Sequence, residues 1–501
     1  MTHKKDTRLI INDLSLTLNQ GDKAVIIGEE GDGKSTLLKI IAEPDSVDYA
    51  DYTGEISPVG IIGYLKQELN ADEKSQTLAG YFAGIDEFSL ASPAEWAEVS
   101  RAVGLEPDLF FANTTVGQLS GGERVKIQLA KILFAKPDIY LLDEPSNDID
   151  IDTLNWLERF INTAKVPVLY VSHDETLIAN TANVIVHMEQ VRGKSLARIT
   201  VARSCYDDYI MARQRAMSYQ AQQARREKDE HDAKLRRFHR IQQSVEHAQN
   251  TVSRQDPAKG RLLKKKMRSV KSLERRIDRE SQDITAAPES ENAIFLSFDN
   301  ANHVPNGKVV LDFLLDELRV GNEVLSTGVE LRVTGPEHVC VIGKNGAGKS
   351  TLIRKIADML LCRNDIRAAY MPQNYEELLD YGAVAAEFLA PAGDRAAVTR
   401  AMSLLGSARY TRDEMSHTIG ELSGGQKGKL FFLKMIIDGA NVLVLDEPTR
   451  NFSPLSNPIL RDMLKNFKGA IISVSHDRRY IAEVATRVYE LKPTGLREFK
   501  G

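Results

Sequence analysis

The fold is decided by a stretch of sequence that occurs twice, VIIGEEGDGKSTLLKIIA at residues 25–42 and VIGKNGAGKSTLIRKIA at residues 341–357. In each copy, a short apolar run that predicts a buried strand leads into a glycine-rich loop and then into a helix-compatible run. Glycines in such a loop allow backbone N–H groups to wrap a phosphate at the positive end of the helix. The sequence therefore predicts two phosphate loops, residues 28–36 and 343–351.

Three more motifs repeat with constant spacing. The runs QLSGGERVKIQLAKIL, IYLLDEPS and VSHD of the first half match ELSGGQKGKLFFLKMI, VLVLDEPT and VSHD of the second. Their equivalent residues are 303 positions apart, as in Ser120 and Ser423, Glu144 and Glu447, and His173 and His476. Chance matches would not preserve this spacing, so the chain contains two copies of one domain. We expect the copies at residues 1–201 and 293–501, joined by a linker at 202–292.

Each copy alternates short apolar runs, such as residues 24–27, 139–142 and 168–171, with longer helix-compatible stretches. This alternation is typical of a mostly parallel sheet covered by helices. The predicted fold class is therefore α/β, with two P-loop domains in tandem joined by a long antiparallel α-helical hairpin.

The composition is that of an ordinary globular protein, with 42% apolar and 27% charged residues. No stretch approaches the roughly 18 uninterrupted apolar residues that a membrane helix needs, and no apolar segment typical of a secretion signal follows the N-terminus. The three widely spaced cysteines exclude a disulfide framework and a CxxC metal site. We therefore expect a cytoplasmic protein.

The residue types of both loops suit a nucleoside triphosphate with Mg²⁺. Lys34 and Lys349 would meet the β- and γ-phosphates, and the serine after each lysine would hold Mg²⁺. A structural glycine turn is the alternative for an isolated match, but two matches in register with the later motifs argue against it. The predicted ATP contacts are Gly28, Gly31, Gly33, Lys34, Ser35, Thr36, Gly343, Gly346, Gly348, Lys349, Ser350 and Thr351.

Two acidic residues end a later apolar run in each copy. Asp143 and Asp446 come first, where a carboxylate can orient Mg²⁺ through its water shell. Glu144 and Glu447 follow, and a glutamate beside the γ-phosphate could polarise or deprotonate the attacking water. We therefore predict that the aspartates bind Mg²⁺ and that the glutamates are catalytic.

A histidine follows the next apolar run of each copy, and a glutamine follows an earlier one. A lone histidine is more often structural, but His173 and His476 each lie 29 residues after the glutamate, which favours a catalytic role. A neutral imidazole there can bridge the glutamate and the γ-phosphate. Gln67 and Gln373 match in position only and are predicted to contact ATP and Mg²⁺.

The most diagnostic motif is LSGG, at residues 119–122 (signature 1) and 422–425 (signature 2). Its hydroxyl and bare backbone N–H groups begin a helix-compatible run and make a second anion-binding terminus. One triphosphate does not need both a phosphate loop and a signature from the same domain. Each signature is therefore expected to close over the nucleotide of the other copy. The predicted contacts are Ser120, Gly121, Gly122, Ser423, Gly424 and Gly425.

The linker differs in charge from the rest of the chain. Residues 203–280 contain 21 Lys/Arg and 11 Asp/Glu, a net of +10, and because the whole chain carries −5, the remainder carries −15. Scarce glycine and proline predict two helices with a tip at about 249–257. Apolar residues at helical steps predict a narrow seam between them, at Phe238, Ile241, Val245, Leu263, Met267, Val270, Leu273 and Ile277.

Basic residues concentrate near the tip of this linker. Such a cluster neutralises phosphates and docks on structured RNA, whereas the alternative is a solvated charged spacer. The candidate RNA contacts are Arg254, Lys259, Arg261, Lys264, Lys265, Lys266 and Arg268.

In this order and twice over, the motifs resemble those of the ATP-binding cassette (ABC) superfamily. Two cassettes with a charged linker and no membrane domain resemble the ABC-F proteins. The resemblance implies a cytoplasmic, monomeric ATPase with an intramolecular cassette pair, which uses ATP and Mg²⁺ and has no membrane or DNA partner. It further implies binding to the ribosomal large subunit near the tRNA exit site with both ATPs enclosed, contact with rRNA and P-site tRNA, and a linker that extends toward the peptidyl-transferase centre.

The stretch LDEPTRNFSPLSNP at 445–458 resembles bacterial members that confer resistance to drugs of the large subunit. We therefore expect protection of the ribosome from antibiotics. The alternatives are an ABC-F factor that rescues stalled ribosomes without drug resistance and, less favoured, the ATPase subunit of a membrane transporter.

Several residues depart from the family pattern. The first cassette (residues 1–201) has little room for the helical arm that members insert, and we expect it to lack the first strand and the adenine-stacking aromatic residue of the family. Glu29, Glu30 and Asp32 place acids in a phosphate loop, which should weaken nucleotide binding unless they point away. In the second cassette (residues 293–501), Ser453 stands where Asp150 stands in the first. The two ATP sites are therefore expected to be unequal.

Overall fold

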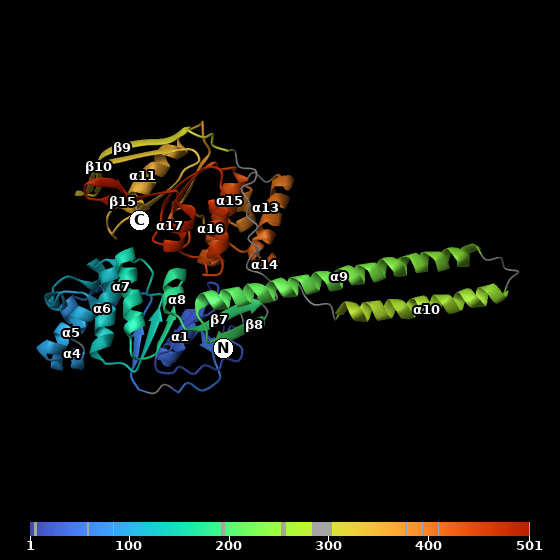
Figure 1. Ribbon diagram of the computed structural model, residues 1–501, viewed down its shortest axis with the longest axis horizontal. Helices are drawn as coiled ribbons and strands as arrows, with labels where there is room; N and C mark the ends of the chain where they lie inside the picture. The colour runs from blue at the N-terminus through green and yellow to red at the C-terminus, as the bar shows by residue number, and fades with distance from the viewer. Residues whose placement is uncertain are drawn as a thin grey trace. The chain divides into compact units, whose positions relative to one another are not determined.

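The computed structural model describes residues 1–4, 8–57, 60–83, 85–191, 196–251, 257–282, 303–375, 378–391, 394–408 and 410–499. Its contacts divide the chain into two compact units. One unit comprises Met1–Tyr206 and Glu291–Gly501 and contains both cassettes, and the other is Asp207–Ser290. Figure 1 allows each unit to be followed by colour along the chain.

The first cassette is built on a six-stranded sheet. Its strands are β2 (Lys23–Ile27), β4 (Ile62–Leu65), β5 (Ile139–Asp143), β6 (Val168–Val171), β7 (Val184–Val191) and β8 (Leu196–Ala202). The strand order is β4-β5-β6-β2-β7-β8, parallel except for the antiparallel pair β7 and β8. The central strands β2 and β6 are buried along their whole length, as expected of strands covered on both faces.

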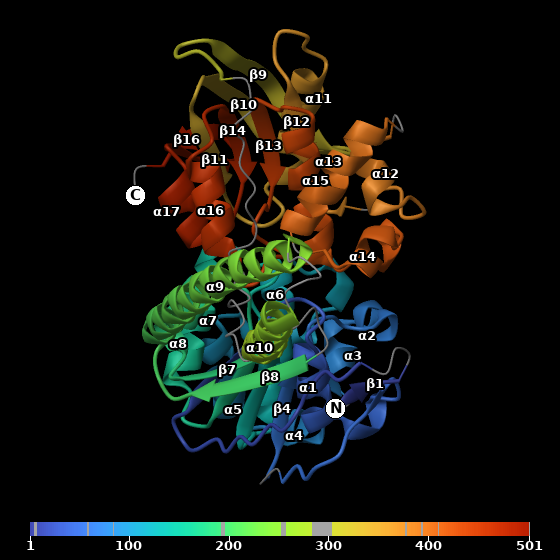
Figure 2. The ribbon, with the colours of Figure 1, turned by 90° about the vertical axis from the view of Figure 1, so that its right-hand side faces the viewer.

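The second cassette repeats this sheet, as Figure 2 shows. Its strands are β11 (His338–Ile342), β12 (Ala368–Met371), β13 (Val442–Asp446), β14 (Ala470–Val474), β15 (Arg487–Lys492) and β16 (Gly495–Glu498). The order β12-β13-β14-β11-β15-β16 is the same, and again the last pair is antiparallel. The predicted α/β fold with two P-loop domains in tandem is therefore confirmed.

Helices follow the motifs in the same order in both cassettes. The phosphate loops lead into α1 (Lys34–Ala42) and α11 (Lys349–Leu361), and the signatures lead into α6 (Gly121–Phe134) and α15 (Gly424–Ile437). The Asp-Glu-Pro motifs precede α7 (Ile151–Thr163) and α16 (Asn457–Lys465), and the histidines precede α8 (Glu175–Thr181) and α17 (Arg478–Val484). The phosphate loops, the Asp-Glu-Pro motifs and the histidines thus lie between the end of a strand and the start of a helix, whereas each signature follows a short 3₁₀ turn.

Side-chain alternation divides the core of the second cassette into two layers. Successive residues of a strand point to opposite faces of the sheet, so Val339 and Val341 of β11 belong to one cluster, and Cys340 and Ile342 belong to the other. Helix α11 contributes to the first cluster, whereas α15 and α16 contribute to the second. Both faces of the sheet are therefore covered by apolar side chains.

A small helical region precedes each signature. In the first cassette it consists of α2 (Ala71–Ser75), α3 (Leu78–Ala83), α4 (Asp86–Leu90), α5 (Pro93–Val103) and the 3₁₀ turns η2 (Pro107–Phe111) and η3 (Val116–Gln118), after an earlier turn η1 (Pro44–Ser46). In the second cassette it consists of α12 (Ala385–Leu389), α13 (Arg395–Ser407), α14 (Arg412–Ser416) and η6 (Ile419–Glu421). The longest described helix of the first region is α5, with 11 residues. This length agrees with the limited room for an inserted arm.

The cassettes differ most before the phosphate loop. The second cassette begins with a long antiparallel pair, β9 (Val309–Val320) and β10 (Glu323–Thr334). The described residues that precede β2 contain only β1 (Thr2–His3), which pairs with β3 (Ala50–Asp51). Among the described residues, a long hairpin therefore precedes the phosphate loop of the second cassette and not that of the first.

The second unit contains two long helices, α9 (Tyr206–Thr251) and α10 (Pro257–Gln282), which lie antiparallel to each other in Figure 1. Phe238, Val245 and Val270 are buried between them, with Leu235 and Met267 packed against this cluster. The predicted helical hairpin is thereby confirmed. No helix in the described part of the chain is both long enough and apolar enough to cross a membrane.

The predicted apolar seam of this hairpin needs a correction at two positions. Ile241 and Leu273 are 38% and 37% exposed, although their spacing suggested the seam. Two helices in contact bury only a narrow stripe, so a residue at its edge stays accessible when no third element covers it. The side chains of Leu263 and Ile277 lie outside the described set.

Candidate nucleotide-binding sites

Both phosphate loops have the same backbone conformation at their last glycine. Gly33 has a φ of 82° and Gly348 a φ of 91°, left-handed values that glycine adopts without strain, and each caps the following helix. The Lys34 ammonium donates to the carbonyls of the first two loop residues at 3.0 and 2.9 Å. Lys349 makes the same two bonds in its own loop, both at 2.9 Å. Each lysine is thus held over its loop.

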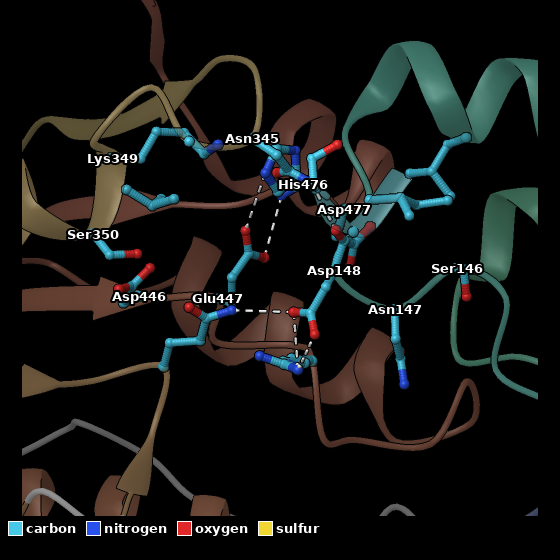
Figure 3. A pocket seen from close by; sticks show the side chains of 18 of the residues that line it. Ser146, Asn147, Asp148, Asn345, Lys349, Ser350, Asp446, Glu447, His476 and Asp477 are labelled. Atoms are coloured by element: carbon cyan, nitrogen blue, oxygen red, sulfur yellow. Dashed lines mark hydrogen bonds and ion pairs between the residues drawn. The ribbon is translucent and has the colours of Figure 1, made fainter. Parts of the chain in front are cut away.

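A cavity of about 780 Å³ lies between phosphate loop 2 (residues 343–351) and signature 1, and is here called site 2. In Figure 3, Lys349, Ser350 and Glu447 of the second cassette lie across from Asn147 and Asp148 of the first. The predicted residues that line it are Ser120, Gly121, His173, Gly346, Gly348, Lys349, Ser350, Thr351, Gln373, Asp446, Glu447 and His476. This is the reciprocal arrangement that the sequence predicts.

Two adjacent carboxyl groups lie at the end of β13 in site 2. Burial raises the pKa of Asp446 to about 6, although a hydrogen bond with Ser350 opposes the shift. Its Oδ1 atom has no hydrogen-bond partner among the described residues. A buried carboxylate oxygen without a partner, beside a serine hydroxyl, is a donor set that suits Mg²⁺. The side chains present therefore fit the predicted metal.

The neighbouring glutamate is held in an unusual backbone conformation. Glu447 has a φ of 52° and Glu144 has a φ of 48°, which is uncommon for residues other than glycine. The Glu447 N–H donates to the Val474 carbonyl at 2.9 Å, and Glu144 makes the equivalent bond to Val171. Strain maintained at equivalent positions of both cassettes points to a functional role for these side chains.

The protonation of this pair is set by burial. Burial, and then the charge of Asp446, raise the pKa of Glu447 to about 8. Burial, followed by the charge of Lys349, lowers the pKa of His476 to about 4. The His476 backbone N–H donates to Glu447 Oε2 at 3.2 Å, and its Nε2 lies 3.8 Å from Oε1. At neutral pH the imidazole is therefore uncharged, as the predicted bridging role requires.

The segment after the first Asp-Glu-Pro motif enters site 2 from the opposite cassette. The Asn345 amide of phosphate loop 2 donates to the Asp148 carbonyl at 2.6 Å. The Asp148 carboxylate accepts from Arg450 at 2.9 Å and from the Gln373 amide at 3.4 Å. Sequence reasoning missed Asp148 and Arg450. Asp148 lies four residues after Glu144, and Arg450 lies three residues after Glu447, so their closeness to the predicted catalytic glutamates was a usable signal.

Phosphate loop 1 (residues 28–36) and signature 2 form the corresponding site 1. The Ser35 hydroxyl donates to Asp143 Oδ1 at 2.8 Å, and the Tyr64 hydroxyl donates to Oδ2 at 3.4 Å. Burial raises the pKa of Asp143 to about 6. Gln67 is exposed beyond the end of β4, so Tyr64 is the side chain of this segment that reaches the aspartate. Sequence reasoning missed Tyr64.

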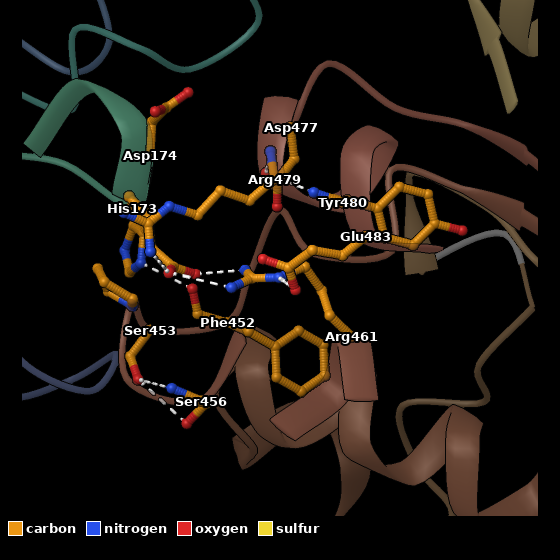
Figure 4. Close-up of polar contacts among 12 residues, drawn as sticks. His173, Asp174, Phe452, Ser453, Ser456, Arg461, Asp477, Arg479, Tyr480 and Glu483 are labelled. Carbon is orange, nitrogen blue, oxygen red and sulfur yellow. Dashed lines mark hydrogen bonds and ion pairs between the residues drawn. The ribbon is translucent and has the colours of Figure 1, made fainter. Parts of the chain in front are cut away.

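The glutamate of site 1 is already paired. The His173 Nε2 atom lies 3.0 Å from Glu144 Oε1, and its Nδ1 lies 3.0 Å from the Phe452 carbonyl of the second cassette. Figure 4 shows His173 beside Phe452. Burial alone would raise the pKa of Glu144, but the charge and hydrogen bond of His173 lower it below its ordinary value. The two glutamates therefore differ in charge state.

The three acids of phosphate loop 1 have separate partners. Asp32 is buried and accepts the Glu29 N–H of its own loop at 2.7 Å. The Glu30 carboxylate accepts the Gly425 N–H of signature 2 at 2.5 Å. The Glu29 carboxylate lies 3.9 Å from the Lys429 ammonium. Two of the three acids thus face the second cassette and not their own loop.

The glycines of signature 1 pack closely against other residues of their own cassette. A side chain at Gly121 would collide with the Asp148 carbonyl, and one at Gly122 would lie 2.8 Å from the Thr153 hydroxyl. Asp150 caps α7 by accepting the Thr153 N–H at 3.0 Å, whereas Ser453 bonds to Ser456 at 3.1 Å. The exchange of Asp150 for Ser453 therefore changes a helix cap.

Comparison with known proteins agrees with this geometry. The family described as ABC transporter matches residues 11–147 and 326–450. ABC transporter F family member 5 of Arabidopsis thaliana is 25% identical over 98% of this chain and 74% of its own length. The ATP-binding protein YdiF of Bacillus subtilis (strain 168) is 28% identical over 98% of this chain and 79% of its own length.

Solved structures share the fold. The RNase-L inhibitor superimposes with a TM-score of 0.58 and 17% identity, over 96% of this chain and 86% of its own. The ribosome-bound archaeal Pelota and ABCE1 assembly gives a TM-score of 0.54 and 17% identity, over 96% of this chain and 75% of that one.

The two phosphate loops, the two signatures and the family match define an ATP-hydrolysing protein of the ABC class. The chain belongs to the ABC transporter family, and within it to the ABC-F proteins, whose F family members align along nearly its whole length.

Proposed function

We propose that this protein is a ribosome-associated ABC-F ATPase of the cytoplasm, which acts as a monomer with an intramolecular cassette pair. In its ATP-bound form it binds the large subunit near the tRNA exit site and contacts rRNA and P-site tRNA. It directs the α9–α10 hairpin toward the peptidyl-transferase centre and protects the ribosome from antibiotics. The observation that carries the proposal is a cavity of about 780 Å³ that is lined by both cassettes, in a chain that also holds a basic helical hairpin.

Site 2 supplies the residues for hydrolysis. Lys349 would bind the phosphates, and Ser350, Gln373 and Asp446 would hold Mg²⁺, which when bound neutralises phosphate charge. The deprotonated form of Glu447 would accept the proton of the attacking water; a pKa of about 8 makes this the minor form at neutral pH but keeps it close to the working pH, where a group exchanges protons efficiently. Lys34, Ser35, Gln67, Asp143 and Glu144 occupy the equivalent positions of site 1, where the Gln67 side chain is exposed.

Closure of site 2 couples the nucleotide to both cassettes. Signature 1 and Asp148 come from the first cassette, whereas the phosphate loop and Glu447 come from the second. A triphosphate held by both would stabilise their association, since a ligand stabilises the state that binds it better. Hydrolysis would remove that link and release the protein from its target.

The hairpin provides a basic surface suited to RNA. Lys264, Lys265, Lys266 and Arg268 are exposed on α10, and cations of this kind bind phosphates with an affinity that falls steeply with salt. Lys259 and Arg261 belong to the same helix, but their side chains are outside the described set, as is all of Arg254. Proteins of the same fold are described as ribosome-bound or as ribosome recycling factors, which supports the choice of target.

The test is to trap the ATP-bound form. The double substitution Glu144→Gln and Glu447→Gln should block hydrolysis and hold the protein on ribosomes that are pelleted through a sucrose cushion with ATP. The same protein with ADP should stay in the supernatant, as should the double variant with Lys349→Ala added. If the trapped protein stays free of ribosomes with ATP present, the proposed target is wrong.

A second candidate within the same family is rescue of stalled ribosomes without drug resistance. Expression in a drug-sensitive bacterium separates the two functions through minimum inhibitory concentrations for antibiotics of the large subunit. Protection predicts a rise for one or more of these drugs and none for drugs of the small subunit. A flat profile with ribosome binding intact would favour rescue, and recovery of the protein with membranes would favour a transporter subunit.

A further inference from the structure

The two phosphate loops differ in what their third residue contacts. Asn345 and Glu30 occupy the same place in the motif GxxxxGKS. The Asn345 side chain donates to the Asp148 carbonyl at 2.6 Å and leaves a cavity between its loop and signature 1. The Glu30 side chain instead reaches across site 1 and accepts the Gly425 N–H at 2.5 Å.

The group that Glu30 contacts is the start of a helix. Helix α15 has 14 residues and is capped by Ser423, so Gly425 is in its first turn. N–H groups in the first turn of a helix have no partner within the helix and attract anions. The Glu30 oxygens also lie 2.9 and 3.0 Å from the point where a Cβ of Gly424 would stand. The carboxylate is therefore seated against both signature glycines, where a phosphate of a nucleotide would be expected.

A second contact joins the same loop to the same helix. The Glu29 carboxylate lies 3.9 Å from the ammonium of Lys429, whose side chain is only 11% exposed. At the equivalent positions of site 2 both residues are cations, Lys344 and Lys126, and Lys126 lies over the Trp156 ring at 5.3 Å. At this pair of positions, the loop and the signature helix are thus opposite in charge at site 1 and both positive at site 2.

We infer that Glu30 is a built-in anionic ligand of signature 2, which closes site 1 in place of a nucleotide phosphate and leaves site 2 as the site that binds and turns over ATP between the cassettes. The inference rests on the roles proposed above for the two loops. A side chain of the same polypeptide competes at a high effective concentration. A triphosphate entering phosphate loop 1 would also meet the negative charge of Glu29 and Glu30.

In this arrangement site 1 is a permanent contact between the cassettes, here called the joint, and site 2 is the contact that ATP opens and closes. The joint would keep the cassettes in contact during nucleotide exchange, because its anion cannot diffuse away. One ATP per cycle would then be sufficient to open and close the other side of the pair. The His173 contacts with Glu144 and with the Phe452 carbonyl are consistent with a site 1 that is already assembled.

The direct test is the number of ATP molecules held by the full chain. In the Glu144→Gln and Glu447→Gln background, radiolabelled ATP with Mg²⁺ should saturate at one molecule per chain. Adding Glu30→Asn, which copies Asn345, should raise the number to two, and Glu30→Gln should do the same by removing the charge. Two ATP molecules of similar affinity before the Glu30 change would overturn the inference.

A reciprocal variant and a nucleotide-free measurement complete the test. Asn345→Glu should install the same block at site 2 and lower the number of ATP molecules by one relative to its parent. Without nucleotide, Glu30→Gln should lower the melting temperature because it weakens the bond to Gly425, whereas an unchanged or higher value would contradict the joint. Ribosome pelleting of the same variants is scored separately, so a wrong target and a wrong site assignment give different results.

Discussion

The Arg461 guanidinium of α16 donates to the Glu175 carboxylate of α8 at 2.5 Å, and both side chains are only 2% exposed. This buried pair joins the second cassette to the first. Arg461 also bonds to Glu483 at 2.8 Å, and Arg479 bonds to Glu175 at 3.2 Å. Figure 4 shows Arg461, Arg479 and Glu483 around this point. The two partners lie 286 residues apart and belong to different cassettes, so the pair holds the cassettes together.

We expect that removing one partner destabilises the protein strongly. Arg461→Met leaves Glu175 buried with Arg479 as its remaining cation, and breaking a buried pair costs about 3–5 kcal/mol. The double variant Arg461→Met and Glu175→Leu should recover most of that loss, because no buried charge remains unpaired. Urea unfolding measures both effects. As a control, Lys434→Ala in an exposed pair should cost about 0.3–0.5 kcal/mol.

Equal losses in the single and double Arg461 variants would show that packing, and not charge pairing, dominates at this position. A loss no larger than that of Lys434→Ala would show that the pair contributes little to the association of the cassettes.

The raised pKa of Glu447 predicts a dependence of stability on pH. Its pKa is about 8 in the folded state and near 4.5 when unfolded, so the folded state binds more protons between these values. Stability is therefore present below about pH 4.5 and is lost as pH rises toward 8, by at most about 1.4 kcal/mol per pH unit. Glu447→Gln cannot titrate and should lack this loss.

The measurement is urea unfolding without nucleotide or Mg²⁺ at pH 6.5 and pH 8. We expect the wild-type protein to lose about 1–2 kcal/mol relative to Glu447→Gln over this interval. The pKa of His476, lowered to about 4, leaves it neutral in the folded state throughout, so only its unfolded form titrates, and this small change is common to both proteins and cancels in the comparison. Parallel pH profiles for the two proteins would contradict the raised pKa.

The α9–α10 hairpin should unfold independently of the cassettes when its small apolar core is disrupted. Phe238 is 4% exposed and packs with Val245 and Val270, and a buried Phe→Ala change costs about 3–5 kcal/mol. Hydrogen exchange in Phe238→Ala should therefore accelerate along α9 and α10 and stay unchanged in the cassettes. Ile241→Ala, at a position 38% exposed, is the matched control and should have a much smaller effect.

The basic surface of α10 should determine the salt dependence of ribosome binding. Replacing Lys264, Lys265 and Lys266 by Gln should weaken binding of the trapped protein and lower the slope of log affinity against log salt by roughly two to three. The same charge change at three exposed cassette lysines, Lys165, Lys465 and Lys468, should leave the slope unchanged. Equal effects of both triple variants would argue for net charge alone.

The sequence was sufficient for features that local patterns encode. The glycine loops, the LSGG runs and their 303-residue spacing predicted the duplicated sheet, the tandem cassettes and the cavity that joins signature 1 to phosphate loop 2. These features depend on residue type and short spacing, because glycine conformations, helix starts and strand ends are local properties.

Contacts between distant segments could not be predicted. The bond from Gly425 to Glu30 spans 395 residues, and its carboxylate could equally have pointed to solvent or into its own loop. Asp148 and Arg450 meet only because the cassettes associate. Ile241 illustrates the opposite case, because its helical spacing suggested burial but a two-helix contact is too narrow to cover it.

The central claim is that the ATP-bound form places the hairpin on RNA of the large subunit. The most direct measurement puts a photoreactive amino acid at Lys265 in the Glu144→Gln and Glu447→Gln protein and maps its crosslinks on purified ribosomes. We expect crosslinks to large-subunit rRNA with ATP and none with ADP, and none to that RNA region from a probe at Leu90, which is 84% exposed on the first cassette. Ribosome-bound protein whose Lys265 probe reaches no rRNA, or reaches it equally with ADP, would contradict the account.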